Sequence, residues 1–542
     1  MADPLQQVNA WIATYSAPEA AVADLLCERH HDDAPALTEV NADLSWREMT
    51  FGELAWSARR LAGGLAALGV GRGDRVATVM GPGCDLAVVA LATWWLGAVH
   101  VPLFTAFAPS VIALRLADAS AAVVVCDGAQ HDKLDLLDRD RAGAPQVVLS
   151  GLTAEQPRGA PTVAGLIAAA EPAGAPVAVG PDAALALVYT SSASGTPTAV
   201  QVPVRALAAL HCFHHFGLDV TDDDVYWNTT DPAVSFGLFF GLISPLLAGH
   251  HSLVLRAGFD PELTLEVMES FGVTNLAASP TIYRALRSTL KTLPPEIALR
   301  RLASAEEPLH EDVVEWAHDV FGVAIHDHYN QTELGVCLGQ ASHPDAAVAR
   351  KPGSMGRALP GWRVTVLDAL DDVEAAPGVV GRVAVDVAHS PLMWFTGYHN
   401  ATAASLRRFS PDGYWYLTGD TASRDTDGDL FFASRDSGLI VTSGYRVGPF
   451  DVESALVAHP AVAEAAVYGV PDEMRGQIVA AEVVLAEGVT ASNELAEELR
   501  RTVRTRFAEH ADPRQLRFVT ELPRTPSGKI RRPRARSASS HG

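Results

Sequence analysis

Near the middle of the chain, an apolar segment leads into a loop of small and hydroxylated residues. Residues 189–198 have the sequence Tyr-Thr-Ser-Ser-Ala-Ser-Gly-Thr-Pro-Thr, and the loop offers Thr190, Ser191, Ser192, Ser194, Gly195 and Thr196. Small side chains let backbone N–H groups approach an anion, so such a loop is typical of phosphate binding. The Gly-Lys-Ser/Thr ending of a Walker loop is missing. Taken alone, the loop is equally typical of a Ser/Thr-rich surface turn.

Four later segments place charged or hydroxylated side chains beside glycine. They are Tyr329–Gly335 with Thr332 and Glu333, Tyr416–Asp420, Arg435–Arg446 with Gly444, and Pro526–Ile530 with Lys529. Each segment alone is a weak signal, but their order and spacing together are specific. Lys529 is one of only four lysines among 41 basic residues, so lysine is kept here where the chain otherwise uses arginine. Because the two cations are not interchangeable, this favours a functional lysine over a solvated tail cation.

These motifs together resemble the adenylate-forming superfamily, and most closely the AMP-forming acyl-CoA synthetases of the short- and medium-chain type. Asp231-Pro232, Ser279-Pro280-Thr281, Pro352–Gly356 and Gly444–Phe450 add to the resemblance, which runs from about Thr38 to Arg532. It implies an α/β fold with a large N-terminal AMP-binding domain at 1–434, made of parallel sheets covered by helices plus a small β subdomain. A small, mobile α+β C-terminal domain is expected at 435–542, with 533–542 as a disordered tail.

The resemblance also implies a two-step reaction. A small-molecule carboxylic acid attacks the α-phosphate of Mg-ATP. Pyrophosphate is released, and an acyl-adenylate is formed. The small domain then rotates, and the thiol of coenzyme A takes the acyl group while AMP departs. The expected activity is therefore that of an AMP-forming acid:CoA ligase that uses ATP, Mg²⁺ and coenzyme A.

The resemblance assigns a role to each matching residue. Lys529 contacts the α-phosphate and carboxylate oxygens, Thr332 contacts the α-phosphate, and Glu333 binds Mg²⁺. Asp420 holds the ribose hydroxyls with Arg435 beside it, Arg446 lies on the phosphate side, and Gly444 lets pantetheine pass. The nucleotide and acid pocket is expected to be completed by Ser304, Ala305, Glu306, Tyr329, Asn330 and Gln331.

Some positions depart from the pattern of that superfamily. Thr198 replaces a lysine of the phosphate loop, which indicates either weaker ATP binding or a loop that tolerates change. Glu306 and Asn330 replace glycines, and Glu306 either bonds an amino group of a ligand or, as we expect, points to solvent. Ser437-Gly438 replaces an Asp-Asp pair at the usual hinge, where glycine still permits large changes of φ and ψ.

The elements that must position these residues alternate between strand and helix. A helical pattern starts at Trp46, buried strands are predicted at Arg75–Met80 and Ala121–Cys126, and Leu86–Val99 is interpreted as a buried helix. Such alternation implies parallel sheets covered on both faces. The Ala-, Gly- and Pro-rich segment 152–182 is predicted to be a linker. Short strands with turns follow from Val364, and an α/β pattern returns after Arg435, with strands at Val462–Val470 and Ile478–Leu485.

Composition excludes several classes of protein. The chain is 48% hydrophobic and 19% charged, which is typical of a globular protein, and 41 basic against 64 acidic residues give a net charge of −23. That charge opposes binding to nucleic acid or anionic membranes. No signal peptide or membrane span is predicted, and the five cysteines form no disulfide pattern, so we expect a cytoplasmic protein. The oligomeric state is open, with a homodimer as one option.

Two other functions and one metal site are alternatives to this hypothesis. The second step could use a carrier-protein thiol or an amine, or the activated acid could be a small oxyacid such as nitrite. A catalytically silent nucleotide-binding protein is the alternative of another class. Thr198 favours it, whereas Lys529, Glu333 and Asp420 oppose it. His211 and His215 have the spacing of a metal pair, but without an evident third ligand they indicate a packed helix.

Overall fold

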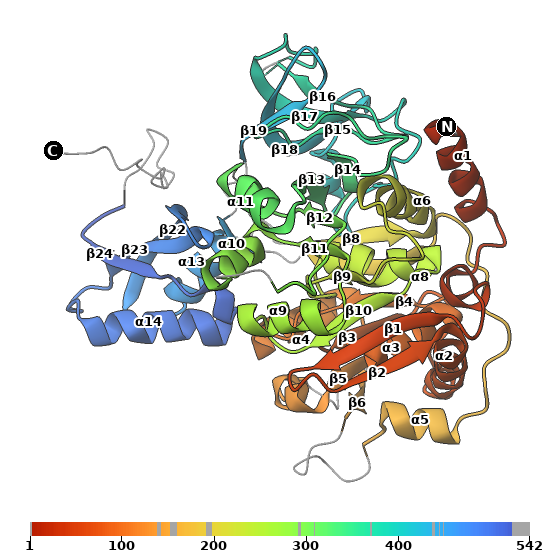
Figure 1. The fold of residues 1–542 in the computed structure, drawn as a ribbon. Helices are drawn as coiled ribbons and strands as arrows, with labels where there is room; N and C mark the ends of the chain where they lie inside the picture. The colour runs from red at the N-terminus through yellow and green to blue at the C-terminus, as the bar shows by residue number, and fades with distance from the viewer. Residues whose placement is uncertain are drawn as a thin grey trace.

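The computed structural model describes residues 3–137, 143–151, 160–190, 198–290, 294–307, 309, 311–368, 371–435, 440–443, 445–447 and 449–522. Two large sheets form the main body (Figure 1). The six-stranded sheet has the order β6 (Gln146–Ser150), β5 (Val123–Asp127), β3 (Arg75–Val79), β4 (Val99–Pro102), β7 (Ala184–Thr190) and β8 (Thr198–Pro203). All of its neighbours are parallel except β7 and β8.

The nine-stranded sheet has a parallel centre with antiparallel strands at both edges. Its order is β15 (Arg357–Ala358), β14 (Gly335–Gly339), β13 (Ile325–Gln331), β12 (Arg301–Ser304), β11 (Asn275–Ala278), β9 (Tyr226–Asn228), β10 (Ser252–Arg256), β1 (Pro35–Asn41) and β2 (Trp46–Thr50). Because β12 and β13 run in parallel, their carboxyl ends meet at one edge of the sheet, where ligands commonly bind.

Two smaller sheets complete the fold. The first is antiparallel and contains β16 (Val364–Leu367), β17 (Val380–Asp386), β18 (Trp415–Arg424) and β19 (Leu430–Arg435). The second belongs to the part of the chain after Arg435, called here the C-terminal segment. It contains β20 (Ile440–Thr442), β21 (Tyr445–Val447), β22 (Val462–Asp472), β23 (Gly476–Leu485) and β24 (Gln515–Val519). The α/β class, with a large parallel body, a β subdomain and an α+β C-terminal part, is therefore confirmed.

Helices connect these strands. They are α1 (Pro4–Tyr15), α2 (Phe51–Ala67), α3 (Cys84–Trp95), α4 (Pro109–Ala119), α5 (Val163–Ala169), α6 (Leu207–Cys212), α7 (Ser235–Gly237), α8 (Ser244–Ala248), α9 (Pro261–Ser270), α10 (Pro280–Thr289), α11 (Glu311–Phe321), α12 (Thr402–Leu406), α13 (Pro449–Val457) and α14 (Asn493–Arg506). Short 3₁₀ or π segments occur at Asp24–Glu28, Gly128–Leu134, Val204–Ala206, Phe213–Gly217, Leu238–Ile243 and Glu509–Ala511. None of the helices in the described part of the chain combines the length and apolar character that crossing a membrane requires.

Three element boundaries differ from the prediction. Trp46–Thr50 is strand β2 instead of helix, because it pairs with β1 and Thr50 then caps α2. The buried helix of the apolar run ends at Trp95, since Gly97 adopts a φ of 65° and the chain enters β4 at Val99. The predicted linker 152–182 contains helix α5.

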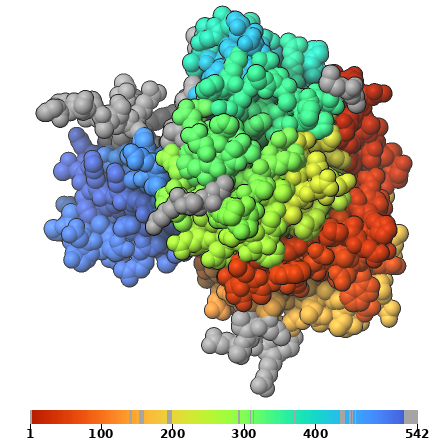
Figure 2. Space-filling model, in the orientation of Figure 1, coloured from red at the N-terminus to blue at the C-terminus, as the bar shows by residue number. Residues whose placement is uncertain are grey.

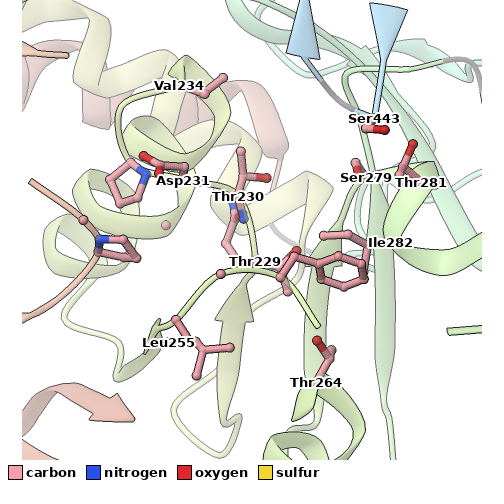
Figure 3. A pocket seen from close by; sticks show the side chains of 18 of the residues that line it. Thr229, Thr230, Asp231, Val234, Leu255, Thr264, Ser279, Thr281, Ile282 and Ser443 are labelled. Atoms are coloured by element: carbon pink, nitrogen blue, oxygen red, sulfur yellow. The ribbon is translucent and has the colours of Figure 1, made fainter. Parts of the chain in front are cut away.

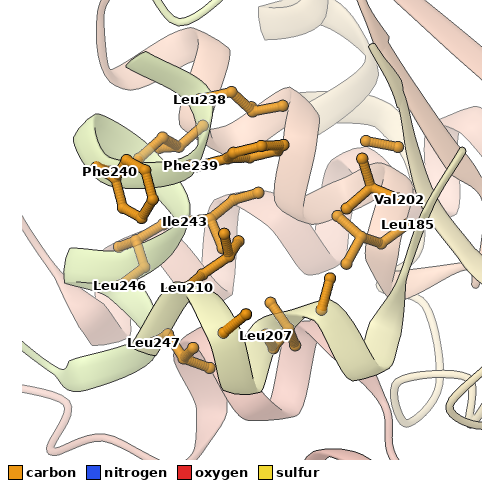
Figure 4. Close-up of a cluster of buried hydrophobic side chains, with 14 of the residues drawn as sticks. Leu185, Val202, Leu207, Leu210, Leu238, Phe239, Phe240, Ile243, Leu246 and Leu247 are labelled. Carbon is orange, nitrogen blue, oxygen red and sulfur yellow. The ribbon is translucent and has the colours of Figure 1, made fainter. Parts of the chain in front are cut away.

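The main core is built from side chains of many helices and strands. Leu207, Leu210, Leu238, Phe239, Phe240 and Ile243 are packed together behind β7 and β8 (Figure 4). The C-terminal segment has its own core, which includes Ile440, Val467 and Leu499. In Figure 1 this segment, with α13, α14 and β22–β24, lies to one side of the main body.

The C-terminal segment docks on the main body through α4 and the residues before it. Phe107 and Val111 pack against the C-terminal core, and the N–H of Ala108 donates to the carbonyl of Phe507 at 2.9 Å. The two parts of the chain therefore share an interface that contains both apolar contacts and backbone hydrogen bonds.

Candidate active site

Asp420 lies at the centre of a buried hydrogen-bond network between β13 and β18. Its carboxylate, 3% exposed, accepts hydrogen bonds from the hydroxyl of Tyr329 and from Nε2 of Gln331 at 3.0 Å. Gln331 also donates to the carbonyl of Thr418 at 2.9 Å and accepts from the hydroxyl of Tyr416 at 3.2 Å. Burial and the nearby Asp420 raise the pKa of Tyr329 well above its ordinary value, so this hydroxyl remains a donor. The network fixes the acid that was predicted to hold ribose.

Glu333, two residues beyond this network on the chain, is held by two donors. Oε1 accepts from the hydroxyl of Tyr398 and from Nη2 of Arg408 at 3.1 Å. Arg408 also donates from Nε to Tyr398 at 2.7 Å and from Nη1 to the carbonyl of Thr418 at 2.8 Å. Burial, together with the Glu333 carboxylate, raises the pKa of Tyr398. No sequence motif points to Tyr398 or Arg408, although they determine where this carboxylate lies.

The base of the predicted phosphate loop lies on the same side of the molecule as Glu333. Thr190 ends β7 and is paired with Thr198 at the start of β8. Val200 of β8 forms a backbone bridge with Tyr398, whose hydroxyl bonds Glu333. Thr198 itself is buried within this strand pair, at the position where a lysine was expected. The loop residues between the strands lie outside the described residues, namely Ser191, Ser192, Ser194, Gly195 and Thr196.

The other predicted residues on β12 and β13, or directly after these strands, are buried around these groups. Thr332 donates from its hydroxyl to that of Ser235 at 3.1 Å, which places it beside the start of α7. Ser304 ends β12, where it is paired with Asp327 of β13. Ala305 and Asn330 are buried as well.

A cavity of about 770 Å³ lies between the main body and the C-terminal segment. Figure 3 shows Thr230, Asp231 and Val234 on one side of it, opposite Ser279, Thr281 and Ser443. Ser443 and Tyr445 come from the C-terminal segment, as do Met474 and Arg475, whereas the remaining wall comes from the main body and includes Phe104, Trp227, Arg256 and Phe259.

Three acidic residues line this cavity, Asp127, Asp231 and Glu306, and the last two lie near Tyr445. Asp231 accepts the N–H of Ala233 at 2.8 Å, and burial raises its pKa to about 6. Glu306 lines the cavity with a positive φ of 79°. Burial raises the pKa of Tyr445, and the carboxylates of Asp231 and Glu306 raise it further. Glu306, which was expected to point to solvent, is half-buried and lines the cavity.

The remaining predicted residues are placed only in part. Arg435 ends β19 in register with Asp420, and Arg446 on β21 is in register with Val441. Gly444, Lys529 and the hinge residues Ser437-Gly438 lie outside the described residues, although Ser443 and Tyr445 on both sides of Gly444 line the cavity.

The histidines considered as a metal pair are packed instead. His211 accepts or donates a hydrogen bond with the Tyr15 hydroxyl at 2.7 Å and stacks on Trp11, while His215 lies against His343. Among the described residues, no group of three or more His, Cys, Asp or Glu side chains is arranged to hold a metal ion.

The fold and these groups define an AMP-forming acid–thiol ligase. The chain belongs to the AMP-binding enzyme family: the model of that family matches residues 25–398, and the model of the AMP-binding enzyme C-terminal domain matches residues 451–529. Within this family, the chain is an enzyme of the acyl-CoA synthetase type, which uses ATP, coenzyme A and an acid.

Three relatives illustrate the similarity. The acetyl-coenzyme A synthetase of Bacillus subtilis is 34% identical over 488 residues, which is 89% of this chain and 84% of the relative. The 4-hydroxybutyrate–CoA ligase 1 of Metallosphaera sedula is 37% identical over 353 residues, covering 64% of this chain and 60% of the relative. The crystal structure of an acyl-CoA synthetase from Brucella canis is 37% identical with a TM-score of 0.72, and the match covers 97% of this chain and 96% of that one.

Proposed function

We propose that this chain joins a small-molecule carboxylic acid to coenzyme A in two steps at the site described above. In the first step a carboxylate oxygen attacks the α-phosphate of ATP, the bond to the leaving pyrophosphate breaks, and an acyl-adenylate forms. In the second step the thiol sulfur attacks the acyl carbon, the carbon–oxygen bond to AMP breaks, and the thiol proton is lost. The products are acyl-CoA, AMP and pyrophosphate.

The observation that carries this proposal is the position of Asp420 relative to Thr332 and Glu333. Asp420 is tied to Tyr329 and Gln331 on β13, and Thr332 and Glu333 lie in the turn that follows this strand directly. Consecutive Cα atoms are about 3.8 Å apart, so Thr332 lies close to the Asp420 network, and a ligand whose ribose binds Asp420 can bring its α-phosphate to Thr332. This is the order in which sugar and phosphate occur in ATP.

The residues around Glu333 fit Mg²⁺. This cation is commonly bound by one or two carboxylates, with phosphate oxygens and water completing its coordination. A single buried carboxylate beside the predicted phosphate loop is suited to that arrangement. When bound, Mg²⁺ neutralises charge on the phosphates, while Arg408 and Tyr398 keep the Glu333 carboxylate in one orientation.

The cavity is suited to the coenzyme A arm because both parts of the chain contribute to it. Ser443 and Tyr445 flank Gly444, which is proposed to let pantetheine pass, and Arg256 and Arg475 in the wall are suited to phosphate groups. Lys529, Arg435 and Arg446 keep the roles that the family pattern assigns to them.

We also propose a domain division at 1–434 and 435–542, a cytoplasmic location, and a homodimer as the state to be tested by light scattering.

A screen of carboxylic acids tests this function. The full-length chain is incubated with Mg-ATP, coenzyme A and one acid at a time, and acyl-adenylate, acyl-CoA, AMP and pyrophosphate are measured by mass spectrometry. We expect at least one acid to give acyl-CoA and AMP in equal amounts. Adenylate without thioester would favour another acceptor, and ATP binding without pyrophosphate for any acid would contradict catalysis.

A further inference from the structure

A charged pair is buried in the main body where the C-terminal segment docks. Arg284 of α10 and Glu307, which follows β12, are 5% and 6% exposed, and Nη2 of Arg284 lies 2.8 Å from Oε2 of Glu307. Thr281 joins the pair, since its hydroxyl donates to Oε1 of Glu307 at 2.8 Å and accepts from Nη2 of Arg284 at 2.8 Å. A buried pair of this kind is costly to separate, so the three side chains form one rigid unit.

This unit contacts a turn of the C-terminal segment, residues 472–476. Nε of Arg284 donates to the carbonyl of Met474 at 3.0 Å. The turn closes on Asp472, which accepts the N–H groups of Met474 and Arg475 at 3.0 and 2.8 Å. Gly476 lies so close that a Cβ there would be 3.2 Å from Oε2 of Glu307. In Figure 2 the blue C-terminal segment packs against the green part of the main body that contains α10.

The same turn holds the residues that line the cavity. The N–H of Ser443 donates to the carbonyl of Arg475 at 3.0 Å, and Nη1 of Arg475 donates to the hydroxyl of Ser443 at 3.2 Å. Thr442 is also paired with Gly476 in the sheet. A contact that fixes the turn therefore fixes Ser443 at the cavity.

We infer that Arg284 and Glu307 are positioning residues for the thiol-transfer step, because they dock turn 472–476 in the orientation that brings Ser443 to the cavity. This inference rests on the proposed function, in which the first step instead requires Lys529 of the same domain at the phosphates. Loss of the docking contact therefore slows thioester formation and leaves adenylate formation intact.

Arg284→Met tests this inference with the two steps measured separately. Acyl-adenylate formation is followed without coenzyme A, and thioester formation is followed in a single turnover after coenzyme A is added to preformed enzyme-bound adenylate. We expect adenylate formation within about twofold of the wild-type rate and thioester formation slower by about tenfold or more, the effect of removing a charged hydrogen bond from one of two states. Arg287→Met, at an exposed position of the same helix, is the matched control and leaves both rates unchanged.

Gly476→Ala provides a second test that leaves the charged pair intact. A Cβ at Gly476 would lie 3.2 Å from Oε2 of Glu307, which makes alanine unfavourable in the docked turn in addition to the strain from its φ of 73°, so thioester formation again falls selectively. Thermal unfolding shows whether each variant is folded. If Arg284→Met does not fold, Gly476→Ala alone tests the inference. Equal losses in both steps, or no loss in either variant, would overturn the inference. If the wild-type chain makes no adenylate from any acid, the proposed function fails instead.

Discussion

Asp420 combines a structural role with the proposed binding of ribose. The hydroxyl of Tyr329 is buried and donates to this carboxylate, as does the amide of Gln331. A buried donor that loses its acceptor destabilises the protein by about 1–3 kcal/mol. The two roles can therefore be separated by substitutions that differ in whether they keep an acceptor.

Asp420→Ala is expected to lower the free energy of unfolding by about 1–3 kcal/mol and to raise the KM for ATP by about tenfold or more. Asp420→Asn keeps an acceptor for Tyr329, so it retains most of the stability, while the KM for ATP still rises because the charge is lost. Denaturant unfolding and steady-state kinetics measure the two effects. Asp132→Asn, whose side chain is 99% exposed, is the control. An Asn variant with a wild-type KM for ATP would contradict the ribose role.

Glu333→Gln isolates the proposed metal ligand. Glutamine can still accept hydrogen bonds from Tyr398 and Arg408, so the melting temperature should change little. The Mg²⁺ concentration that gives half-maximal adenylate formation should rise by about tenfold or more, because a carboxylate ligand is lost. Glu311→Gln, which alters a carboxylate paired with Arg350, is the control. An unchanged Mg²⁺ dependence would remove Glu333 from the metal site.

The sequence identifies some of these residues and misses others for a physical reason. Thr332, Glu333 and Asp420 stand in short motifs beside glycines, so their chemistry can be recognised locally. Tyr398 and Arg408 lie 65 and 75 residues from Glu333 along the chain, and only tertiary packing brings them to it. Glu306 could be recognised as unusual, but its place in the cavity wall depends on the docking of the C-terminal segment.

At the scale of elements, the boundary between β2 and α2 shows what local sequence does and does not specify. Thr50 accepts the N–H of Glu53, and Glu53 accepts the N–H of Thr50, which is a capping box that starts the helix at Phe51. The Thr-x-x-Glu pattern is visible in the sequence and could have corrected the predicted start. The strand at Trp46–Thr50, by contrast, depends on pairing with β1.

Helix α1 packs against His211, a buried histidine that the fold keeps neutral. His211 bonds Tyr15 and stacks on Trp11, and it faces His215, His250, His30 and Arg29. Burial, and then the electrostatic effect of these neighbours, lower its pKa to about 3. A histidine whose pKa is lowered on folding stabilises the native state fully above its ordinary pKa of about 6.5, and this contribution is lost as the pH falls toward 3.

His211→Gln is therefore expected to flatten the pH dependence of stability. Below pH 6.5 the unfolded wild-type chain binds a proton at this residue that the native state does not bind, so the free energy of unfolding falls with decreasing pH. Removing the group should reduce that slope by up to roughly 1.4 kcal/mol per pH unit. Denaturant unfolding between pH 7 and pH 4.5, with exposed His31→Gln as control, measures the difference. Equal slopes would show that His211 is not held neutral.

For the whole molecule, charge and binding follow different rules. The net charge of −23 opposes polyanions that contact a broad surface, yet the cavity carries Arg256 from the main body and Arg475 from the C-terminal segment. A nucleotide ligand therefore meets two local cations, although Asp127, Asp231 and Glu306 line the same cavity. The α/β layers follow from strand and helix patterns along the chain, whereas the complete wall of this cavity requires Ser443, Tyr445, Met474 and Arg475 of the C-terminal segment to pack on the main body.

The most direct test of the proposed reaction follows one oxygen atom. An accepted acid labelled with ¹⁸O in both carboxylate oxygens is converted to acyl-CoA, and AMP and pyrophosphate are examined by mass spectrometry. Attack of the carboxylate on the α-phosphate predicts one ¹⁸O in each AMP and none in pyrophosphate, because the carbon–oxygen bond breaks in the second step. Unlabelled AMP, or label in pyrophosphate, would contradict formation of an acyl-adenylate.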